Sequence, residues 1–284
     1  MKKILFCLSF SLCTLIPQVA FAFEATREGN TLRFTGEINE ESEKAIVQHL
    51  RSGASTLIVN SEGGSAGSGQ TIAFEIIKQN ASVIVDKYCM SSCANYLFLA
   101  AKEKSLMPGA VLGFHGGIHF SEEEFKVKKG DSKLIVAMKK TFQKLHKTET
   151  ALFKKMGIDH QIIKDSFDLT KVEKRPAVIT IDAHGETFTF NAEQTKEIKK
   201  LIHELQKEGK IFNFSVTNAS EQSLNKAYFP SKETLMNRYR VKGIVNYPYP
   251  SSQDEVDNIA KAIAIALGNE EGFIIVGEFS SEKK

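Results

Sequence analysis

The chain has 284 residues, of which 42% are hydrophobic and 25% charged, and this ordinary globular composition excludes a disordered, collagen-like or low-complexity protein. Its formal net charge is +3, but Lys2 and Lys3 lie in a segment that we expect to be removed. The remaining chain is then close to neutral, which disfavours nucleic acid as a partner.

Residues 1–22 have the pattern of a secretory signal peptide. A short positive start is followed by an apolar run over residues 4–16 and then by Ala20-Phe21-Ala22. The run is too short for a membrane span, which needs about 20 residues, and the small residues predict cleavage after Ala22. An uncleaved anchor is the alternative. We expect an exported chain, periplasmic or secreted, with no membrane span once the signal is removed.

Export leaves two cysteines in the mature chain, Cys89 and Cys93. An oxidising compartment favours a disulfide between them, and a strand-to-helix turn would bring them within reach of each other. A redox-active dithiol or a metal site is the alternative. Dithiols usually have two intervening residues rather than three, however, and no histidine or second cysteine pair lies nearby. We therefore expect a disulfide and no metal.

Short strands and helices alternate in the first part of the chain. We predict them in turn at residues 31–38, 40–50, 55–60, 67–79, 81–88, 92–101 and 109–114. The run at 55–60 is continuously apolar, as is typical of a strand buried in a parallel sheet. This alternation predicts an α/β fold with right-handed βαβ crossovers and a mostly parallel sheet.

The regular alternation of short strands and helices then ends. We predict an exposed loop at residues 121–132, a long amphipathic helix at 133–155 with a solvated basic face, and a short helix at 159–167. Residues 176–191 alternate with period two around His184-Gly185, which predicts a β-hairpin, and a helix at 192–208 and a strand at 211–216 follow.

These elements divide the chain into five parts. They are the signal peptide 1–22, a core 23–170, an inserted α/β subdomain 171–222, a return to the core 223–250, and a C-terminal helix and strand 251–284.

The turn at Gly63-Gly64 is the first candidate site. It follows a buried strand and precedes a helix, so its backbone N–H groups can face the crevice at the carboxyl end of the sheet. Such donors suit a developing negative charge. A tight turn with nothing bound is the alternative. The turn lacks both the lysine of a phosphate loop and the spacing of a dinucleotide fingerprint, so no cofactor is expected.

Two serines and a histidine follow the next two predicted strands. Ser91 and Ser92 precede a helix, where a serine is either an N-cap or a nucleophile. His115 ends the following strand, and the carboxyl ends of parallel strands share one edge, so a hydroxyl and this imidazole can meet there. His119 is the substitute base. The other histidines are expected at the surface: His49, His146, His160, His184 and His203.

The order of these motifs resembles the proteolytic subunit of Clp-type proteases. It is also similar to the signal peptide peptidase group and the wider crotonase-like superfamily, with exported Clp-protease-like proteins the nearest in pattern. The resemblance rests on the run from Asn60 to Gly64, on Ser92 before a helix, and on His115 seven residues after Pro108. It covers about residues 31–117 and resumes weakly at 229–247.

This resemblance implies stacked βαβ units and a serine peptidase or other acyl hydrolase acting on a peptide or protein. By position Ser92 matches the nucleophile, with Ser91 as the alternative, and His115 matches the general base. The N–H groups of Gly63 or Gly64 and of Cys93 match the oxyanion hole.

The third member of the triad departs from the family pattern. The family's aspartate precedes its closing segment, which residues 229–247 resemble, and at that point this chain has Asn225-Lys226-Ala227-Tyr228 and no acid. Asp165 or Asp168 could serve instead. The helix at 133–155 corresponds to the segment through which Clp-type subunits oligomerise, which implies a homo-oligomer, although the insertion could block ring stacking.

Two other functions compete with this one. The first is a non-catalytic relative that binds a peptide or a partner protein. The second is an acyl-thioester enzyme of the crotonase type, which export away from coenzyme A disfavours.

Overall fold

The structure is a computed structural model, and it describes residues 23–118, 126–128, 133–170, 178–183, 186–191, 194–209, 212–217, 226–268 and 274–279. The expected signal peptide, His119 and the His184-Gly185 turn lie outside the described residues, as does most of the predicted loop at 121–132. Cleavage and export therefore stay predictions. Within the described part of the chain, no helix combines the length and the apolar character that crossing a bilayer requires.

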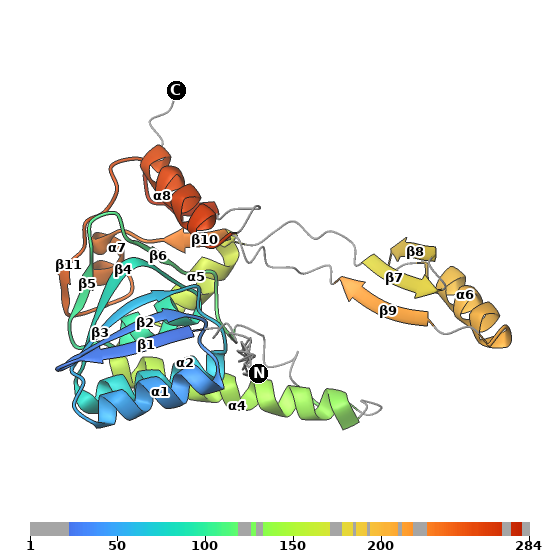
Figure 1. Cartoon of the computed structure of the whole chain (residues 1–284), viewed down its shortest axis with the longest axis horizontal. Coiled ribbons are helices and arrows are strands. Elements are labelled where there is room, and N and C mark those ends of the chain that lie inside the picture. The colour runs from blue at the N-terminus through green and yellow to red at the C-terminus, as the bar shows by residue number, and fades with distance from the viewer. Residues whose placement is uncertain are drawn as a thin grey trace, which may run out of the picture.

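A seven-stranded sheet forms the centre of the core (Figure 1). Its strands are β1 (Phe23–Glu28), β2 (Thr31–Gly36), β3 (Thr56–Ser61), β4 (Ser82–Met90), β5 (Lys104–Leu106), β6 (Val111–Gly113) and β11 (Ile244–Asn246). They follow the order β1-β2-β3-β4-β5-β11, with β6 paired to β4 outside this path. Only the β1–β2 pair is antiparallel, so the predicted α/β class with a mostly parallel sheet is confirmed.

The long strand β4 pairs with two strands in succession. Its residues 83–85 pair with β5, and its residues 88–90 pair with β6. On its other side Cys89 pairs with Ser61 at the end of β3. The carboxyl ends of β3, β4 and β6 therefore lie next to one another at one edge of the sheet.

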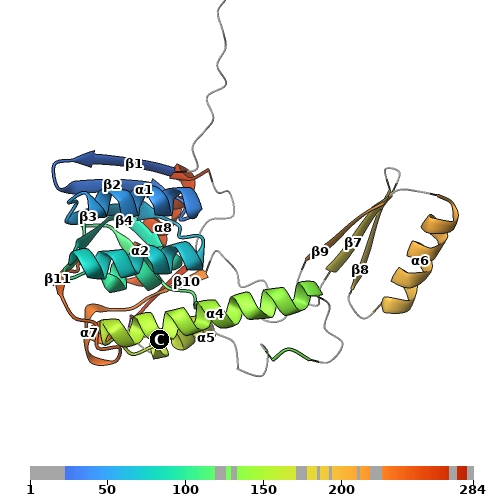
Figure 2. The same ribbon diagram turned by 90° about the horizontal axis from the view of Figure 1, so that it is seen from below.

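Helices cover the core sheet, and Figures 1 and 2 show α1, α2 and α4 along one of its faces and α8 on the opposite side. The helices of the core are α1 (Glu40–Arg51), α2 (Ala66–Gln79), the π-helix η1 (Cys93–Phe98), α4 (Lys133–Met156), α5 (Gln161–Thr170), α7 (Lys232–Asn237) and α8 (Gln253–Ala266). Cover on both faces explains why Leu57, Ile58 and Val59 of β3 are all buried although successive side chains point to opposite faces, and why this strand reads as a continuous apolar run.

Two features of the core differ from the sequence prediction. The strands β1, β5 and β10 (Lys226–Phe229) were not expected, because β5 and β10 have only three and four residues and most residues of β1 are polar. The helix predicted at 92–101 contains a π-helical segment at 93–98 instead of continuous α-helix. A π-helical turn accommodates an extra residue, and such turns are frequent at functional sites.

The segment after the insertion returns to the candidate site. Strand β10 pairs in parallel with β12 (Ile274–Gly277), and Tyr228 of β10 forms a β-bridge with Phe114, directly before His115. Glu278 fastens this C-terminal strand by accepting hydrogen bonds from the Ser231 N–H (3.1 Å) and the Thr234 hydroxyl (2.5 Å).

The inserted residues form a small unit of their own. Strands β7 (Val178–Ala183), β8 (Glu186–Asn191) and β9 (Phe212–Thr217) make an antiparallel sheet in the order β8-β7-β9, accompanied by α6 (Thr195–Lys207). The predicted hairpin, helix and strand are thus confirmed. Ile181, Ala183, Ile198 and Leu205 form a buried cluster separate from the main core, and Figures 1 and 2 show the unit set apart from that core.

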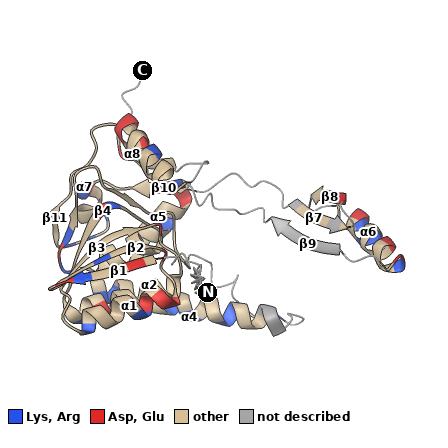
Figure 3. Ribbon diagram, in the orientation of Figure 1, with Lys and Arg blue, Asp and Glu red and all other residues tan. Residues whose placement is uncertain are grey.

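Acidic and basic residues are interspersed over both the core and the inserted unit. Figure 3 shows acidic and basic residues interspersed along α1 and α6, as expected for a nearly neutral mature chain. On α4 the apolar side chains of Met138 and Phe142 are exposed. The homo-oligomer expected through this helix stays a prediction.

Candidate active site

The glycine turn (Gly63-Gly64), the serine turn (Ser91-Ser92) and His115 follow β3, β4 and β6, whose carboxyl ends are adjacent. The Ser91 N–H donates to the Gly113 carbonyl oxygen at 2.8 Å, which continues the β4–β6 pairing by one residue. His115 comes two residues after Gly113. The backbone thus brings the serine turn and the histidine to the same edge of the sheet.

The glycine turn packs directly against the serine turn. Gly63 and Gly64 have φ angles of 98° and 137°, which side chains rarely tolerate. A Cβ atom at Gly63 would lie only 2.7 Å from both the Met90 carbonyl oxygen and the Ser91 Cβ. On its other side the Gly63 carbonyl oxygen accepts the Ile38 N–H at 2.7 Å. Glycine at position 63 therefore allows the two turns to lie in contact.

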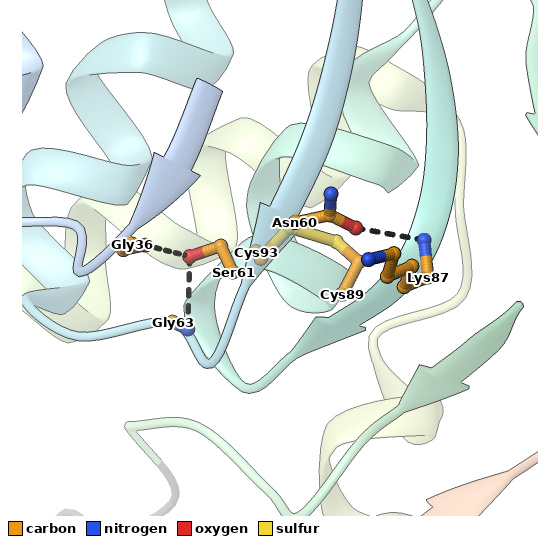
Figure 4. The surroundings of a disulfide bond; sticks show 7 residues. All are labelled: Gly36, Asn60, Ser61, Gly63, Lys87, Cys89 and Cys93. Atoms are coloured by element: carbon orange, nitrogen blue, oxygen red, sulfur yellow. Dashed lines mark hydrogen bonds between the residues drawn. A yellow bond between two sulfur atoms is a disulfide. The ribbon is translucent and has the colours of Figure 1, made fainter. Parts of the chain in front are cut away.

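The two glycine N–H groups differ in their hydrogen bonding. The Gly63 N–H donates at 3.1 Å to the hydroxyl of Ser61, which is fully buried and itself donates to the Gly36 carbonyl oxygen at 2.7 Å (Figure 4). Among the hydrogen bonds of the described residues, none uses the Gly64 N–H as a donor. Of the two glycines considered for the oxyanion hole beside Cys93, only Gly64 is exposed and has an N–H without an acceptor among the described residues.

The two serines occupy different environments. Ser91 is half-buried and has a left-handed φ of 54°, which is a strained value for a residue with a side chain. Ser92 is 4% exposed, and its hydroxyl donates to the Gly64 carbonyl oxygen at 2.8 Å. Ser92 thereby ties the serine turn to the glycine turn, whereas Ser91 stands at the sharp bend between strand and helix.

The helix after the serines supplies further donors. Backbone N–H groups in the first turn of a helix have no intrahelical acceptor, and η1 begins at Cys93, directly after Ser92. The Asn95 N–H closes the turn by donating to the Ser91 carbonyl oxygen at 2.8 Å. The partial positive charge of this helix start favours an anion beside Ser91.

A disulfide joins Cys89 and Cys93, with 5.2 Å between their Cα atoms, so the predicted pairing is confirmed. Both cysteines are fully buried, and the bond brackets both serines. Figure 4 shows the disulfide beside Asn60 and Ser61, the residues that lead into the glycine turn. The covalent link therefore restrains the backbone on both sides of the serine turn.

We expect the double substitution Cys89→Ala/Cys93→Ala to lower the free energy of unfolding by about 2 kcal/mol, because the unfolded chain loses a short closed loop. Chemical denaturation measures this change. The wild-type chain should lose a similar amount of stability in reductant, whereas the double variant should not respond. Equal stability of the wild-type chain with and without reductant would contradict this role.

Buried polar side chains hold the backbone that carries His115. The Asn95 side-chain N–H donates to the Gly116 carbonyl oxygen at 2.5 Å, and the Gly116 N–H donates to the Ser166 hydroxyl at 3.0 Å. The Thr170 hydroxyl donates to the His115 carbonyl oxygen at 3.4 Å. Asn95, Ser166 and Thr170 are each at most 2% exposed. Residues of η1 and α5 thus position the histidine through its main chain.

Glu149 of α4 also holds the backbone that follows His115. It is fully buried and accepts hydrogen bonds from the Tyr96 hydroxyl at 2.5 Å and the Ile118 N–H at 3.4 Å. Its other oxygen lies 2.9 Å from Nε2 of His160. Burial, and secondly the charge of Glu149, raises the pKa of the Tyr96 hydroxyl well above its usual range. The sequence prediction missed Glu149, because it falls within a charged helical stretch.

Three of the histidines expected at the surface, His49, His146 and His160, are only partly exposed. His160 is the partner of buried Glu149, and its side chain is 31% exposed. Half-buried His146 hydrogen-bonds through Nδ1 to the Ile118 carbonyl oxygen at 2.9 Å. His146 and His160 are partly covered because α4 packs against the segment after His115, through Ile118, and the start of α5 packs against Glu149 of α4.

We expect Glu149→Gln to lower the free energy of unfolding by about 1–3 kcal/mol, because the neutral amide oxygen is a weaker acceptor than the carboxylate for the Tyr96 hydroxyl and the Ile118 N–H. Denaturant titration measures the loss. The matched control is Glu233→Gln on α7, where the side chain is exposed and the change should be small. Equal effects of the two substitutions would contradict the assigned hydrogen bonds.

The aspartates considered for the third position make other contacts. Asp165 accepts hydrogen bonds from Arg238 (2.6 Å), Tyr239 (2.9 Å) and Gln161 (2.9 Å). Partial burial would raise the pKa of Asp165, but these hydrogen bonds and the Arg238 charge lower it overall. Asp168 pairs with Lys164 at 2.5 Å, and both side chains are about half exposed. Asp165 thus links α5 to the closing segment.

Comparisons with known proteins do not assign the site. No protein-family model matches the chain, and no curated protein matches it. Within the described residues, no group of three or more His, Cys, Asp or Glu side chains is placed to hold a metal ion. The functional assignment therefore rests on the geometry of the three turns.

Proposed function

We propose that this chain is an exported serine peptidase or related acyl hydrolase of the Clp-protease and crotonase-like type, with Ser91 as nucleophile and His115 as general base. One observation carries the proposal. Ser91 has a left-handed backbone at a strand-to-helix turn, and its N–H bonds to Gly113 in the strand that leads to His115. In α/β-hydrolases a strained strand-to-helix turn likewise presents the nucleophilic serine hydroxyl at the edge of the sheet.

The geometry favours Ser91 over Ser92, which reverses the order suggested by sequence position. The Ser92 hydroxyl is almost inaccessible and already donates its proton to the Gly64 carbonyl oxygen. A substrate could reach it only if that hydrogen bond broke and the two turns separated. Ser91 needs neither change.

The proposed reaction proceeds in two balanced steps. The Ser91 Oγ attacks the substrate carbonyl carbon while His115 accepts the hydroxyl proton, and the resulting oxyanion is held by the N–H groups of Gly64 and Ser92. Collapse of this intermediate expels the leaving amine or alcohol, which takes the proton from His115. Water, deprotonated by His115, then attacks the acyl-enzyme, and Ser91 leaves with that proton. If Ser92 were the nucleophile, Cys93 would supply the second N–H.

No carboxylate is assigned to the mechanism. The Asp165 carboxylate already accepts hydrogen bonds from Arg238 and Tyr239 of the closing segment. The hydrogen bonds that the Asn95, Ser166 and Thr170 side chains make with the main chain of His115 and Gly116 would hold the histidine in place without a third side chain. We therefore propose a serine–histidine dyad acting on a peptide or protein substrate. The disulfide supports the proposed export, because such bonds persist in oxidising compartments.

Labelling with a fluorophosphonate tests the proposal. The oxidised wild-type chain should form one covalent adduct, mapped by mass spectrometry to Ser91, and His115→Ala should lose it while keeping the wild-type circular dichroism spectrum. Failure of the folded, oxidised chain to label would overturn catalysis. That result would favour the competing function, a module that binds a peptide or partner protein, for which the absence of an acid at residues 225–228 is the supporting observation.

A further inference from the structure

A buried lysine lies at the end of the sheet opposite the candidate active site. Lys104 begins β5 and is 3% exposed. Its ammonium group donates to the carbonyl oxygens of Ala101 (2.5 Å) and Lys242 (2.9 Å). An ammonium group has three donors, and the third finds no acceptor among the described residues. No carboxylate in the described part of the chain pairs with Lys104 either.

A cavity of about 180 Å³ adjoins this lysine. Three exposed lysines, Lys102, Lys155 and Lys242, line it together with Lys104, and no aspartate or glutamate does so. None of the three exposed lysines forms an ion pair with another described residue. Four lysines thus line one space, and none of them forms an ion pair with an acidic residue of the described chain.

We infer that this cavity binds a small oxyanion of the phosphate class, held by Lys104 and by the lysines at its rim. A charged group removed from water is costly unless a counter-charge pairs with it, and lysines are fully buried in proteins almost only when paired. Phosphate supplies that counter-charge, and lysine is a common phosphate ligand. The volume accommodates either free phosphate or a small phosphate monoester.

The site is independent of the proposed catalysis. Lys104 pairs with Val83 near the start of β4, whereas Ser91 follows the end of that strand. The helix between them begins at the serine turn and ends near Ala101, whose carbonyl oxygen accepts from Lys104. A failure of anion binding would therefore leave the nucleophile assignment untouched.

Titration calorimetry of the full mature chain with inorganic phosphate at constant ionic strength tests the inference. We expect saturable one-to-one binding with a Kd of about 1 mM or tighter. Lys155→Gln/Lys242→Gln should weaken binding about tenfold, because both side chains are exposed, line the cavity and are not needed for folding. The matched control, Lys196→Gln/Lys199→Gln on α6, should bind as the wild type does. Absence of saturable binding, or equal binding by both double variants, would overturn the proposal.

Two further arms identify the ligand and the role of Lys104. Tighter binding of glycerol 3-phosphate than of inorganic phosphate would support the site and indicate a phosphate ester as its natural ligand. Sulfate keeps its charge across the range of interest, while burial lowers the pKa of Lys104 to about 8. Sulfate affinity should therefore fall as the pH rises from about 8 to 9.5, whereas ordinary lysines stay charged there. Unchanged sulfate affinity over that range would overturn the assignment of Lys104.

Discussion

Replacement of Ser91 by alanine should abolish covalent labelling and lower hydrolytic kcat on the order of 10⁴- to 10⁶-fold, because the one other hydroxyl between β4 and η1, that of Ser92, is buried and already donates to the Gly64 carbonyl oxygen. The fold should survive, since the change removes one half-buried oxygen atom. The rate of fluorophosphonate labelling and the hydrolysis of an activated ester both measure the effect.

Ser92→Ala provides the matched control one residue away. It removes the hydrogen bond to the Gly64 carbonyl oxygen and should slow labelling only about tenfold, because it loosens the contact between the two turns without removing the nucleophile. The reverse pattern, with labelling retained in Ser91→Ala and lost in Ser92→Ala, would transfer the role to Ser92. The oxyanion donor would then be the Cys93 N–H.

Gly63→Ala should lower the free energy of unfolding by about 3–5 kcal/mol and also abolish labelling. The new Cβ would meet backbone atoms on the serine turn, the Met90 carbonyl oxygen at 2.7 Å and the Ser92 nitrogen at 2.9 Å. These atoms cannot move aside without displacing Ser91. The positive φ of 98° adds a conformational cost. Denaturant unfolding and the labelling rate report the two effects separately.

Gly29→Ala is the matched control, because it measures the cost of a positive φ without a steric clash. Gly29 also has a positive φ, 59°, but a Cβ built on it meets nothing within 4 Å. Its substitution should therefore cost about 1 kcal/mol. If both alanine variants lost the same stability, the contact between the glycine and serine turns would be unsupported.

The pattern of strands and helices could be predicted because it depends on local periodicity. Buried parallel strands such as β3 form continuous apolar runs, and the helices between them show an apolar stripe. Periodicity did not predict the short strands. In β5, for example, Lys104 is buried only because its ammonium group reaches carbonyl oxygens on two other segments.

The surroundings of His115 could not be predicted in the same way. Asn95, Glu149 and Ser166 are polar residues on helices, and such residues are usually solvent-exposed. They are buried here because η1, α4 and α5 meet over the segment that follows β6, where each side chain finds a backbone partner. No local pattern marks a residue whose partner lies dozens of positions away.

The amino-acid sequence was sufficient to determine the α/β class, the mostly parallel sheet, the inserted unit and the pairing of Cys89 with Cys93, because these follow from periodicity, composition and short spacing. Only the tertiary structure decided which serine stands at the bend and which glycine N–H is open. It also decided where the unpaired lysine charge lies. A left-handed φ at Ser91, a hydrogen bond from Ser92 to Gly64 and the burial of Lys104 all arise from contacts between separate segments. Contacts of this kind are set by how the helices and strands pack together, and no local sequence pattern specifies them.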